Sequence, residues 1–463
     1  MKTVRLASIK ISNIKNVKDG QIIMPNTYKK RLSDKNAEIL GIYGQNGSGK
    51  TAVIDTLYYL QKIMIGESLE DKLADYIDVS ASEAEIITDF HLFGDNVVYD
   101  VTYRVFLQKH EKGAVIARET LSCAVYKEGT RSNKTVFMDF QRENADIIFR
   151  PRKRLEEVIA ANPENQTDLL VARKLAEKSN CSYIFGDSSF EIFNKKYDNN
   201  FACCAEVITA LFRFALKDLF VIRNEHSGVI SANFVLPMAF KLEKEKVGMK
   251  EDFAVPLDQP VVLNAERKQM LEEIVKLINV VLFTIIPEMK IGIRDDGVQL
   301  LDSGETGYKV ELVSLREDRP PIPIRMESEG IIKIISILNA LIQAFGSPSI
   351  CLAIDELDAG IFEYMLGELL DIFKDSAKGQ LIFTSHNLRP LEMLDKENIM
   401  FSTVNPNKRY IHLKNIKASN NIRDVYLRGI TLGGQEEVIY EATDSLKIAR
   451  AFRKAGRSIR HEQ

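Results

Sequence analysis

Eight residues near the N-terminus combine glycines, a lysine and a hydroxyl in an order that suits phosphate binding. Residues 44–51 read Gly-Gln-Asn-Gly-Ser-Gly-Lys-Thr and match the pattern G-x-x-x-x-G-K-[ST]. Glycines let the backbone wrap so that several N–H groups point at one phosphate chain, Lys50 brings a mobile positive charge, and Thr51 can ligate Mg²⁺. A plain Gly-rich turn before a helix is the alternative, but the complete pattern predicts a nucleoside triphosphate site. The predicted phosphate-binding residues are Gly44, Asn46, Gly47, Ser48, Gly49, Lys50 and Thr51.

A second group consists of two adjacent carboxylates, Asp355 and Glu356, which follow the apolar run Ile350–Ile354. Such a run is typical of a central strand buried on both faces of a parallel sheet. Acids at its carboxyl end reach the crevice where open α/β sheets bind ligands. We therefore expect Asp355 to hold Mg²⁺ and Glu356 to orient the attacking water. A buried strand that simply ends in solvated acids is the alternative.

Two weaker signals accompany this pair. His386 follows the strand-like run Gln380–Thr384. From there it could reach the outermost phosphate, although a histidine at a strand end is often an ordinary surface residue. Ser328 and Gly330 open an apolar helix directly upstream of the carboxylate strand. A hydroxyl, a glycine and free N–H groups suit a phosphate there, and a plain helix cap explains them equally well.

Strands and helices must hold these groups in place. The phosphate loop lies between a strand-like run, residues 39–43, and a helix-like run, Ala52–Ile63. Before it, we expect a strand over residues 4–11, a turn at 13–16 and a hairpin reversal at Asp19-Gly20. Alternating apolar and polar residues predict further antiparallel strands over 84–93, 97–107 and 121–126, and strands over 290–300 and 308–315.

The middle of the chain has a different pattern. Helix-like segments are predicted at Leu155–Ala161, Asp168–Lys178 and Ala205–Leu219, without a sustained heptad repeat. We expect four parts: an N-terminal half of the head (1–149), a mainly helical insert or arm (150–262), a C-terminal half of the head (263–415) and a helical tail (416–463) that could dock a partner. The tail ends in a basic segment with Arg450, Arg453, Lys454, Arg457 and Arg460.

Composition limits the class of protein. The net charge of −3 argues against coating nucleic acid through bulk charge, while a local basic patch remains compatible with it. Five cysteines and six histidines show no metal spacing or disulfide framework, which favours a cytoplasmic protein. Residues 1–25 lack a signal-peptide pattern. The longest apolar run, Ile331–Phe345, contains Lys333 and is short for a membrane span.

Taken in order, five motifs resemble the ATPase heads of the SMC/RecF group. They are Asn13-Ile14-Lys15, the phosphate loop, Ser328-Glu329-Gly330, Asp355-Glu356 and His386. Within that group the chain looks most like the ATPase components of bacterial antiphage systems, of the abortive-infection, PARIS-like or Septu-like kind. The resemblance covers residues 1–110 and 260–400. It implies an α/β fold, an ABC-type P-loop ATPase head with a mixed sheet and a helical insert, with ATP and Mg²⁺ as ligands.

The resemblance also implies roles for residues. Lys50 and Thr51 would bind the phosphates and Mg²⁺, Asp355 would bind Mg²⁺, Glu356 would act on water, and His386 would sense the γ-phosphate. In a head-to-tail homodimer or higher homo-oligomer, Ser328 and Gly330 would close the partner's ATP site in trans, and Lys15 would lie near the nucleotide. The sequence departs from the family pattern in three places: the signature lacks the second glycine and the glutamine, no Q-loop glutamine stands out between Tyr76 and Leu107, and the D-loop at 355–360 is compressed.

Three functions fit these observations. The first is an ATP-driven switch, the sensor or scaffold of an antiphage system that controls a separate effector, a nuclease or toxin. The second is a RecF-like DNA-repair ATPase that binds DNA directly through Arg150, Arg152, Lys153 and Arg154. The third is a scaffold in which ATP holds an oligomer together with slow turnover.

Overall fold

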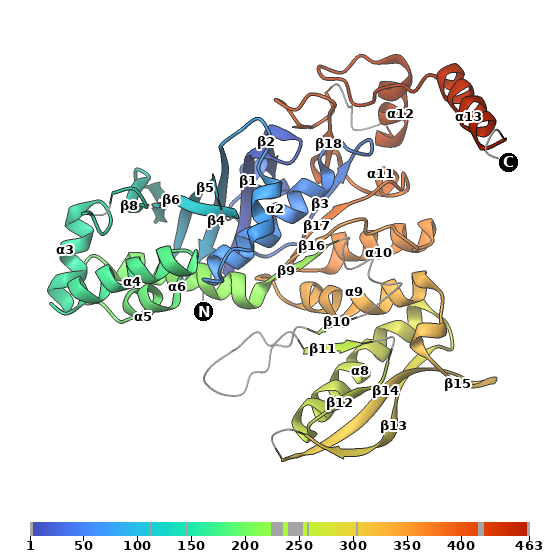
Figure 1. Ribbon diagram of the computed structural model, residues 1–463, viewed down its shortest axis with the longest axis horizontal. Coiled ribbons are helices and arrows are strands. Elements are labelled where there is room, and N and C mark those ends of the chain that lie inside the picture. Colours follow the sequence, from blue (N-terminus) through green and yellow to red (C-terminus); the bar gives the residue numbers. More distant parts are fainter. Residues whose placement is uncertain are drawn as a thin grey trace.

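The computed structural model describes residues 3–111, 113–144, 146–223, 235–238, 253–256, 259–301, 304–414 and 421–460. Two large sheets and a smaller one lie side by side, with helices on their faces (Figure 1). The chain is α/β with a mixed sheet, as the sequence predicts. Part of the predicted insert, residues 224–234 and 239–252, lies outside the described residues, as does the predicted boundary at 415/416.

The first sheet is antiparallel, with strand order β2-β1-β4-β5-β6-β7, and β8 also pairs with β6. Alternating burial along β4 and β5 shows that one face packs on a core and the other meets solvent. The strands are β1 (Thr3–Ile14), β2 (Val17–Ile23), β4 (Glu83–Phe93), β5 (Val97–His110), β6 (Gly113–Lys127), β7 (Thr130–Arg131) and β8 (Thr135–Gln141).

One predicted turn is wrong. The chain reverses at Lys15–Asn16, whereas Asp19 and Gly20 lie inside β2, paired with Ser12 and Ile11 of β1. Lys15 takes a left-handed φ of 51° at the reversal. Gly20 serves close packing instead of a turn, because a Cβ there would lie 2.7 Å from the ring of Tyr410.

The second sheet is mainly parallel and has the order β19-β18-β3-β17-β16-β9. Its central strands are buried along their whole length, which explains why most of their residues are apolar. The strands are β3 (Glu38–Tyr43), β9 (Leu219–Ile222), β16 (Cys351–Ile354), β17 (Gln380–Thr384), β18 (Ile399–Ser402) and β19 (Tyr410–Ile411).

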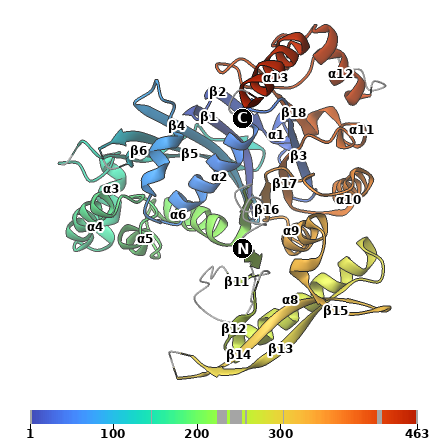
Figure 2. The same ribbon diagram turned by 45° about the vertical axis from the view of Figure 1, so that its right-hand side comes forward.

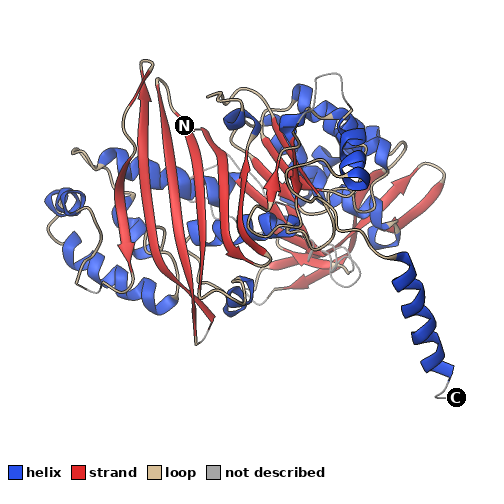
Figure 3. Cartoon of the chain, turned by 90° about the horizontal axis from the view of Figure 1, so that it is seen from above, coloured by secondary structure: helices blue, strands red, loops and turns tan. Residues whose placement is uncertain are grey.

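Helices cover both large sheets. One core joins the antiparallel sheet, the inner face of the parallel sheet and helices of the first half of the chain, and Figure 3 shows that group of helices along one face of the antiparallel sheet. A second core lies on the other face of the parallel sheet. The helices are α1 (Pro25–Tyr28), α2 (Lys50–Met64), α3 (Arg152–Ala161), α4 (Asn165–Ser179), α5 (Asp187–Phe193), α6 (Ala202–Arg213), α8 (Ala265–Ile285), α9 (Glu329–Gly346), α10 (Glu363–Ser376), α11 (Pro390–Met393), α12 (Ile422–Leu432) and α13 (Ser445–Arg460).

The helix predicted over Ala205–Leu219 ends early. α6 stops at Arg213, a π-helical turn covers Phe214–Asp218, and Leu219 already begins β9. Gln61 of α2 donates a hydrogen bond to the carbonyl of Ala215 (2.9 Å) and another to that of Leu219. This contact from a helix distant in sequence satisfies carbonyls that a continued helix would have bonded itself.

A third core lies between α8 and the smaller sheet, which is made of β12 (Val261–Leu263), β13 (Lys290–Leu300), β14 (Thr306–Arg316) and β15 (Arg319–Pro323). A separate hairpin pairs β10 (Val235–Met238) with β11 (Phe253–Pro256). The first half of α9 packs in this third core and its second half packs on the parallel sheet. By length and composition α9 could cross a membrane, but 61% of it is buried, as in a core helix of a folded domain.

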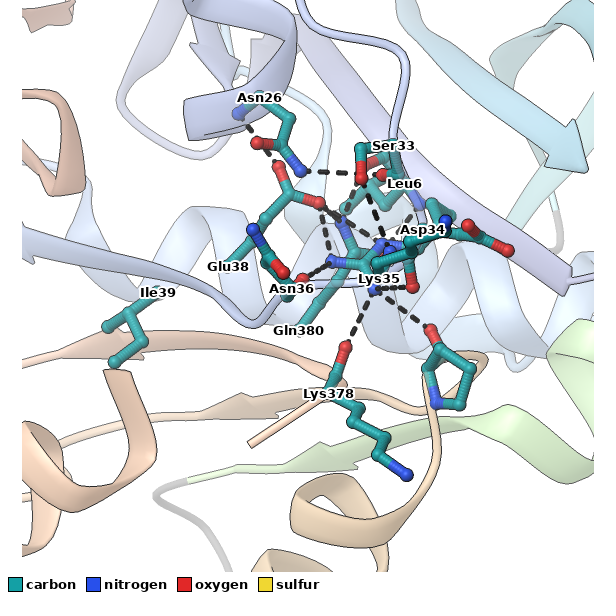
Figure 4. Close-up of polar contacts among 12 residues, drawn as sticks. Leu6, Asn26, Ser33, Asp34, Lys35, Asn36, Glu38, Ile39, Lys378 and Gln380 are labelled. Atoms are coloured by element: carbon teal, nitrogen blue, oxygen red, sulfur yellow. Dashed lines mark hydrogen bonds and ion pairs between the residues drawn. The ribbon is translucent and has the colours of Figure 1, made fainter. Parts of the chain in front are cut away.

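A buried polar network joins the two large sheets (Figure 4). Arg5 of β1 is 2% exposed and donates to Glu38, the first residue of β3, at 2.8 Å. The same guanidinium reaches the carbonyl of Lys378 at 2.8 Å. Gln380, the first residue of β17, bonds both Glu38 and the backbone of Leu6. The network lies at the amino ends of the parallel strands, opposite the predicted phosphate site.

Candidate functional site

Three predicted motifs meet because three parallel strands are neighbours. β3 leads into the phosphate loop, β17 into Ser385-His386, and β16 into Asp355-Glu356. β17 pairs with both β3 and β16 in parallel register. The carboxyl ends of all three strands therefore lie at one edge of the sheet, where α/β folds bind ligands. Figure 2 shows α2 leaving this edge between the two sheets.

The phosphate loop has the backbone that its glycines predict. Gly44, Gly47 and Gly49 take positive φ values of 152°, 75° and 91°, conformations that side chains disfavour. Gly44 also packs so closely on Ser402 of β18 that a Cβ would overlap the serine hydroxyl. Ser48 donates to the carbonyl of Gln45 at 2.6 Å. These contacts define the conformation of the loop.

Neighbouring turns hold the loop from outside. Asn16, in the β1–β2 turn, donates to the carbonyl of Gly47. Tyr410 of β19 donates from its hydroxyl to the carbonyl of Gly49 at 2.7 Å. Arg409 in turn donates to the carbonyl of Asn16. The two hairpins therefore bind carbonyl groups on one side of the loop, and the Ser48 N–H bonds within the loop to the carbonyl of Gln45 at 3.2 Å.

Lys50 folds its ammonium back over the loop. It is 6% exposed and donates to the carbonyls of Gly44 at 2.9 Å and Gln45 at 3.0 Å. Burial lowers the pKa of Lys50, while Asp355, Glu356 and Asp358 act in the opposite direction. A phosphate chain is the group that would replace both carbonyl partners with stronger, charge-assisted hydrogen bonds.

Asp355 is the buried member of the acidic pair. The side chain is 1% exposed, and its Oδ1 accepts hydrogen bonds from Thr384 (2.5 Å) and Thr51 (3.5 Å). Its Oδ2 is buried without a hydrogen-bond partner among the described residues. A buried carboxylate oxygen without a partner is costly. The Thr51 hydroxyl and this oxygen form the oxygen-rich, sparsely liganded site that Mg²⁺ takes when phosphates and waters complete its shell.

Glu356 has an unusual backbone for a non-glycine residue. Its φ is +48°, in the left-handed region, and its N–H donates to the hydroxyl of Thr384 at 2.7 Å. One threonine hydroxyl thus orients both members of the acidic pair. Non-glycine residues with such backbones are concentrated at functional sites, where the surrounding structure holds them in place.

His386 lies exposed at the end of β17. Its backbone N–H and that of Asn387 both donate to the carboxylate of Asp358, at 3.1 and 3.0 Å. Partial burial lowers the pKa of the His386 imidazole and the Lys50 ammonium adds to this, whereas Asp358, Glu356 and Asp355 oppose it. The first two effects favour the neutral imidazole, which can donate one hydrogen bond and accept one.

Ser328 and Gly330 open α9 beside the acidic pair. Ser328 is the N-cap residue and its hydroxyl accepts from the N–H of Ile331 at 3.4 Å. Gly330 lies so close to Gly360 that a Cβ would overlap the Gly360 carbonyl oxygen. One turn further, Lys333 is 3% exposed. Burial lowers the pKa of Lys333, and Asp355, Glu356 and Asp358 act against this.

Lys15 is engaged with protein groups. Its ammonium forms an ion pair with Asp55 of α2 and lies 4.6 Å from the centre of the Tyr76 ring. Asp55 also accepts from Arg223 at 2.9 Å. One edge of the sheet brings together the phosphate loop, Asp355, Glu356 and His386. Lys15, in the β1–β2 turn, instead contacts α2 through Asp55, and Ser328 caps α9.

Sequence reasoning missed several residues of this site. Thr384 orients the acidic pair and Asp358 holds the loop that carries His386. Each lies two positions from a predicted residue, Thr384 from His386 and Asp358 from Glu356. This closeness in sequence was the signal that could have indicated them. The backbone of Glu441 pairs with the side chain of Gln45, accepting at 3.4 Å and donating at 2.9 Å. No sequence pattern indicates that contact between residues 396 positions apart.

No family model and no curated protein matches this sequence. Among solved structures, the chain is similar to an Smc head bound to the C-winged helix domain of ScpA, at 14% identity and a TM-score of 0.43, covering 88% of this chain and 97% of that one. It is also similar to the SMC head domain from Thermotoga maritima (12%, TM-score 0.36, covering 89% and 99%). A head domain from Pyrococcus yayanosii gives 13% and 0.40, covering 91% and 100%. At such values these likenesses carry no argument about function.

Proposed function

We propose that this chain binds ATP with Mg²⁺ and hydrolyses it as an ABC-type ATPase. The observation that carries the proposal is the unpartnered, buried Oδ2 of Asp355, a carboxylate whose other oxygen lies 3.5 Å from the Thr51 hydroxyl at the end of the phosphate loop. A phosphate cradle, a lysine and an acid converge there from segments more than 300 residues apart. That combination suits a magnesium-bound triphosphate better than any other ligand class.

Each residue has a definite task in this proposal. Lys50 exchanges its carbonyl partners for the outer phosphates, and the loop N–H groups with the N-terminus of α2 bind the phosphate oxygens. When bound, Mg²⁺ supplies charge neutralisation between the phosphates, and Thr51 and Asp355 hold it. Glu356 accepts a proton from the attacking water and orients it, while neutral His386 donates a hydrogen bond to the terminal phosphate.

We infer that two copies close head to tail over ATP. Ser328 and Glu329 are exposed at the start of α9. The Ser328 hydroxyl caps the N–H of Ile331, and the N–H groups of Glu329 and Gly330, which have no earlier turn of the helix to bond, suit an anion. The contact between Gly330 and Gly360 ties this start to the segment that follows the acidic pair. A phosphate held by a second copy would therefore be sensed next to Glu356.

The biological role that we favour is a switch that controls a separate effector in antiphage defence, based on the resemblance of the motifs alone. The RecF-like alternative needs free basic groups at 150–154. Arg152 pairs with Glu156 at 2.9 Å and Arg154 with Glu157 at 2.8 Å, which weakens the positive potential available to a phosphate backbone. Degradation of DNA or RNA by the purified chain, through residues outside the ATP site, would contradict a separate effector.

Two variants test the ATPase. Lys50→Ala should abolish binding of a fluorescent ATP analogue, because the phosphates lose their mobile cation. Glu356→Gln should keep that binding, slow hydrolysis by about a hundredfold or more, and accumulate a dimer in ATP that light scattering detects.

The matched control is Glu128→Gln, because Glu128 also takes a left-handed φ (51°) in an exposed turn between β6 and β7. It should hydrolyse ATP at the wild-type rate. Wild-type turnover by Glu356→Gln would overturn the assigned role.

A further inference from the structure

The C-terminal helix α13 stands clear of the rest of the molecule (Figures 1 and 3). Its sequence, residues 445–460, contains six basic residues and no acidic one. Since the whole chain has a net charge of −3, removing six positive charges leaves −9 on the remainder. A strongly basic helix is therefore attached to an acidic body.

One side of α13 is apolar. Ile448, Phe452 and Ala455 recur at intervals of four and three residues, which places them on one face of the helix. The basic residues fall on the remaining circumference. Phe452 is 76% exposed and Ile448 44% exposed. Exposed apolar surface rimmed by charge marks an interaction site.

A surface of matching character lies on α10. Its outer face carries Tyr364, Glu368, Asp371, Ile372 and Asp375, which share one side of the helix at helical spacing. Tyr364 is 54% exposed and Ile372 60% exposed. The three carboxylates form no ion pair with another described residue. This face offers two apolar contacts flanked by negative charge.

We propose that α13 of one copy docks on the outer face of α10 of a second copy. Its apolar stripe would cover Tyr364 and Ile372, and its arginines and lysines would reach around to the three acids. The helices have similar lengths, 16 and 14 residues, so the contact can run along both. Exchange in both directions gives a symmetric dimer with two such contacts.

The connector between the body of the chain and α13 is short. Val404 donates to the carbonyl of Val438 at 2.8 Å, and Glu441 is paired with Gln45. These contacts anchor the chain as far as Glu441 and leave residues 442–444 before α13 begins, a span of about 10 Å at full extension. In Figures 1 and 3, α13 points away from the body of its own chain.

Charge-reversal variants test the exchange. One variant carries Arg450→Glu and Arg453→Glu on α13, and the other carries Glu368→Lys and Asp375→Lys on α10. Without nucleotide and at low salt, wild type should form dimers in sizing with light scattering. Each variant alone should dissociate about tenfold or more readily, because like charges then face each other. An equimolar mixture of the two should recover the wild-type dimer fraction, since both contacts in the mixed dimer are complementary again.

The control reverses two exposed acids elsewhere, Asp95→Lys with Glu128→Lys, and should leave dimerisation unchanged. Thermal unfolding should show that every variant folds. A monomeric wild type, or a mixture that stays dissociated, would overturn the proposal. So would a wild type that binds phosphatidylserine vesicles or DNA through Arg450 and Arg453 without dimerising.

This exchange does not depend on the proposed ATP site. Lys50→Ala should dimerise like wild type without nucleotide, and loss of dimers in that variant would contradict the helix exchange. Failure of ATP hydrolysis, by contrast, would leave the result of the mixing experiment untouched.

Discussion

At the scale of single residues, Thr384 controls more of the candidate site than its size suggests. Its hydroxyl donates to Asp355 and accepts from the N–H of Glu356, and the residue is fully buried. Thr384→Val keeps the shape and removes both bonds, so the half-buried N–H of Glu356 loses its partner at a cost of about 1 kcal/mol or more. We expect the kcat for ATP hydrolysis to fall about tenfold or more, with a higher Mg²⁺ concentration for half-maximal rate.

Thr384→Ser is the matched control, because it retains the hydroxyl and loses only a methyl group. Its rate should stay within a few-fold of wild type in a steady-state phosphate-release assay over a Mg²⁺ series. If Thr384→Val hydrolysed ATP as wild type does, the hydroxyl would have no part in positioning the acids.

The sequence was most informative about residues whose chemistry is encoded locally. The phosphate loop needs its glycines in fixed positions, and Gly44, Gly47 and Gly49 have the expected left-handed or otherwise restricted backbone. Thr384, Asp358 and Gln45 act through partners distant in sequence, so their roles depend on the strand order of the parallel sheet. Nothing in a linear pattern of residues specifies that order.

At the scale of elements, the position of the start of α9 depends on Gly330 having no side chain. A Cβ at residue 330 would overlap the carbonyl oxygen of Gly360, which is backbone and cannot rotate away. We expect Gly330→Ala to push α9 away from the acidic segment, lowering the free energy of unfolding by about 1–3 kcal/mol and reducing hydrolysis. Chemical denaturation and an ATPase assay measure the two effects.

Gly346 ends the same helix and provides the control. A Cβ there meets nothing within 4 Å, and its φ is not among the positive ones. Gly346→Ala should be neutral or up to about 1 kcal/mol more stable. Equal effects of the two substitutions on stability would show that the close contact between Gly330 and Gly360 has no energetic importance.

Two elements show why local patterns mislead. Asp19-Gly20 has the residue types of a hairpin turn, yet it lies within β2 because the reversal occurs four residues earlier and the Tyr410 ring occupies the space beside Gly20. The helical pattern at 205–219 continues past Arg213 in sequence, but Leu219 is taken into the parallel sheet as the partner of Cys351. In both places a contact distant in sequence overrides the local preference.

At the scale of the whole molecule, two sheets act as one body because their contact is polar and buried as well as apolar. Arg5 and Glu38 are 2% and 3% exposed and join β1 to β3 at the edge away from the proposed ATP site. Gln380 adds β17 to the same network. A hydrophobic contact alone would tolerate sliding, whereas these directional bonds fix one position of the antiparallel sheet against the parallel sheet.

This network predicts a large effect from a residue far from the nucleotide. Glu38→Ala leaves the Arg5 guanidinium buried without its carboxylate, and removing one partner of a buried pair costs about 3–5 kcal/mol. Asp19→Ala, in the exposed Lys10–Asp19 pair, should cost no more than about 1 kcal/mol. Urea unfolding followed by circular dichroism measures both. If Glu38→Ala were as stable as Asp19→Ala, the sheets would be held together by apolar packing alone, and the polar joint would have no energetic role.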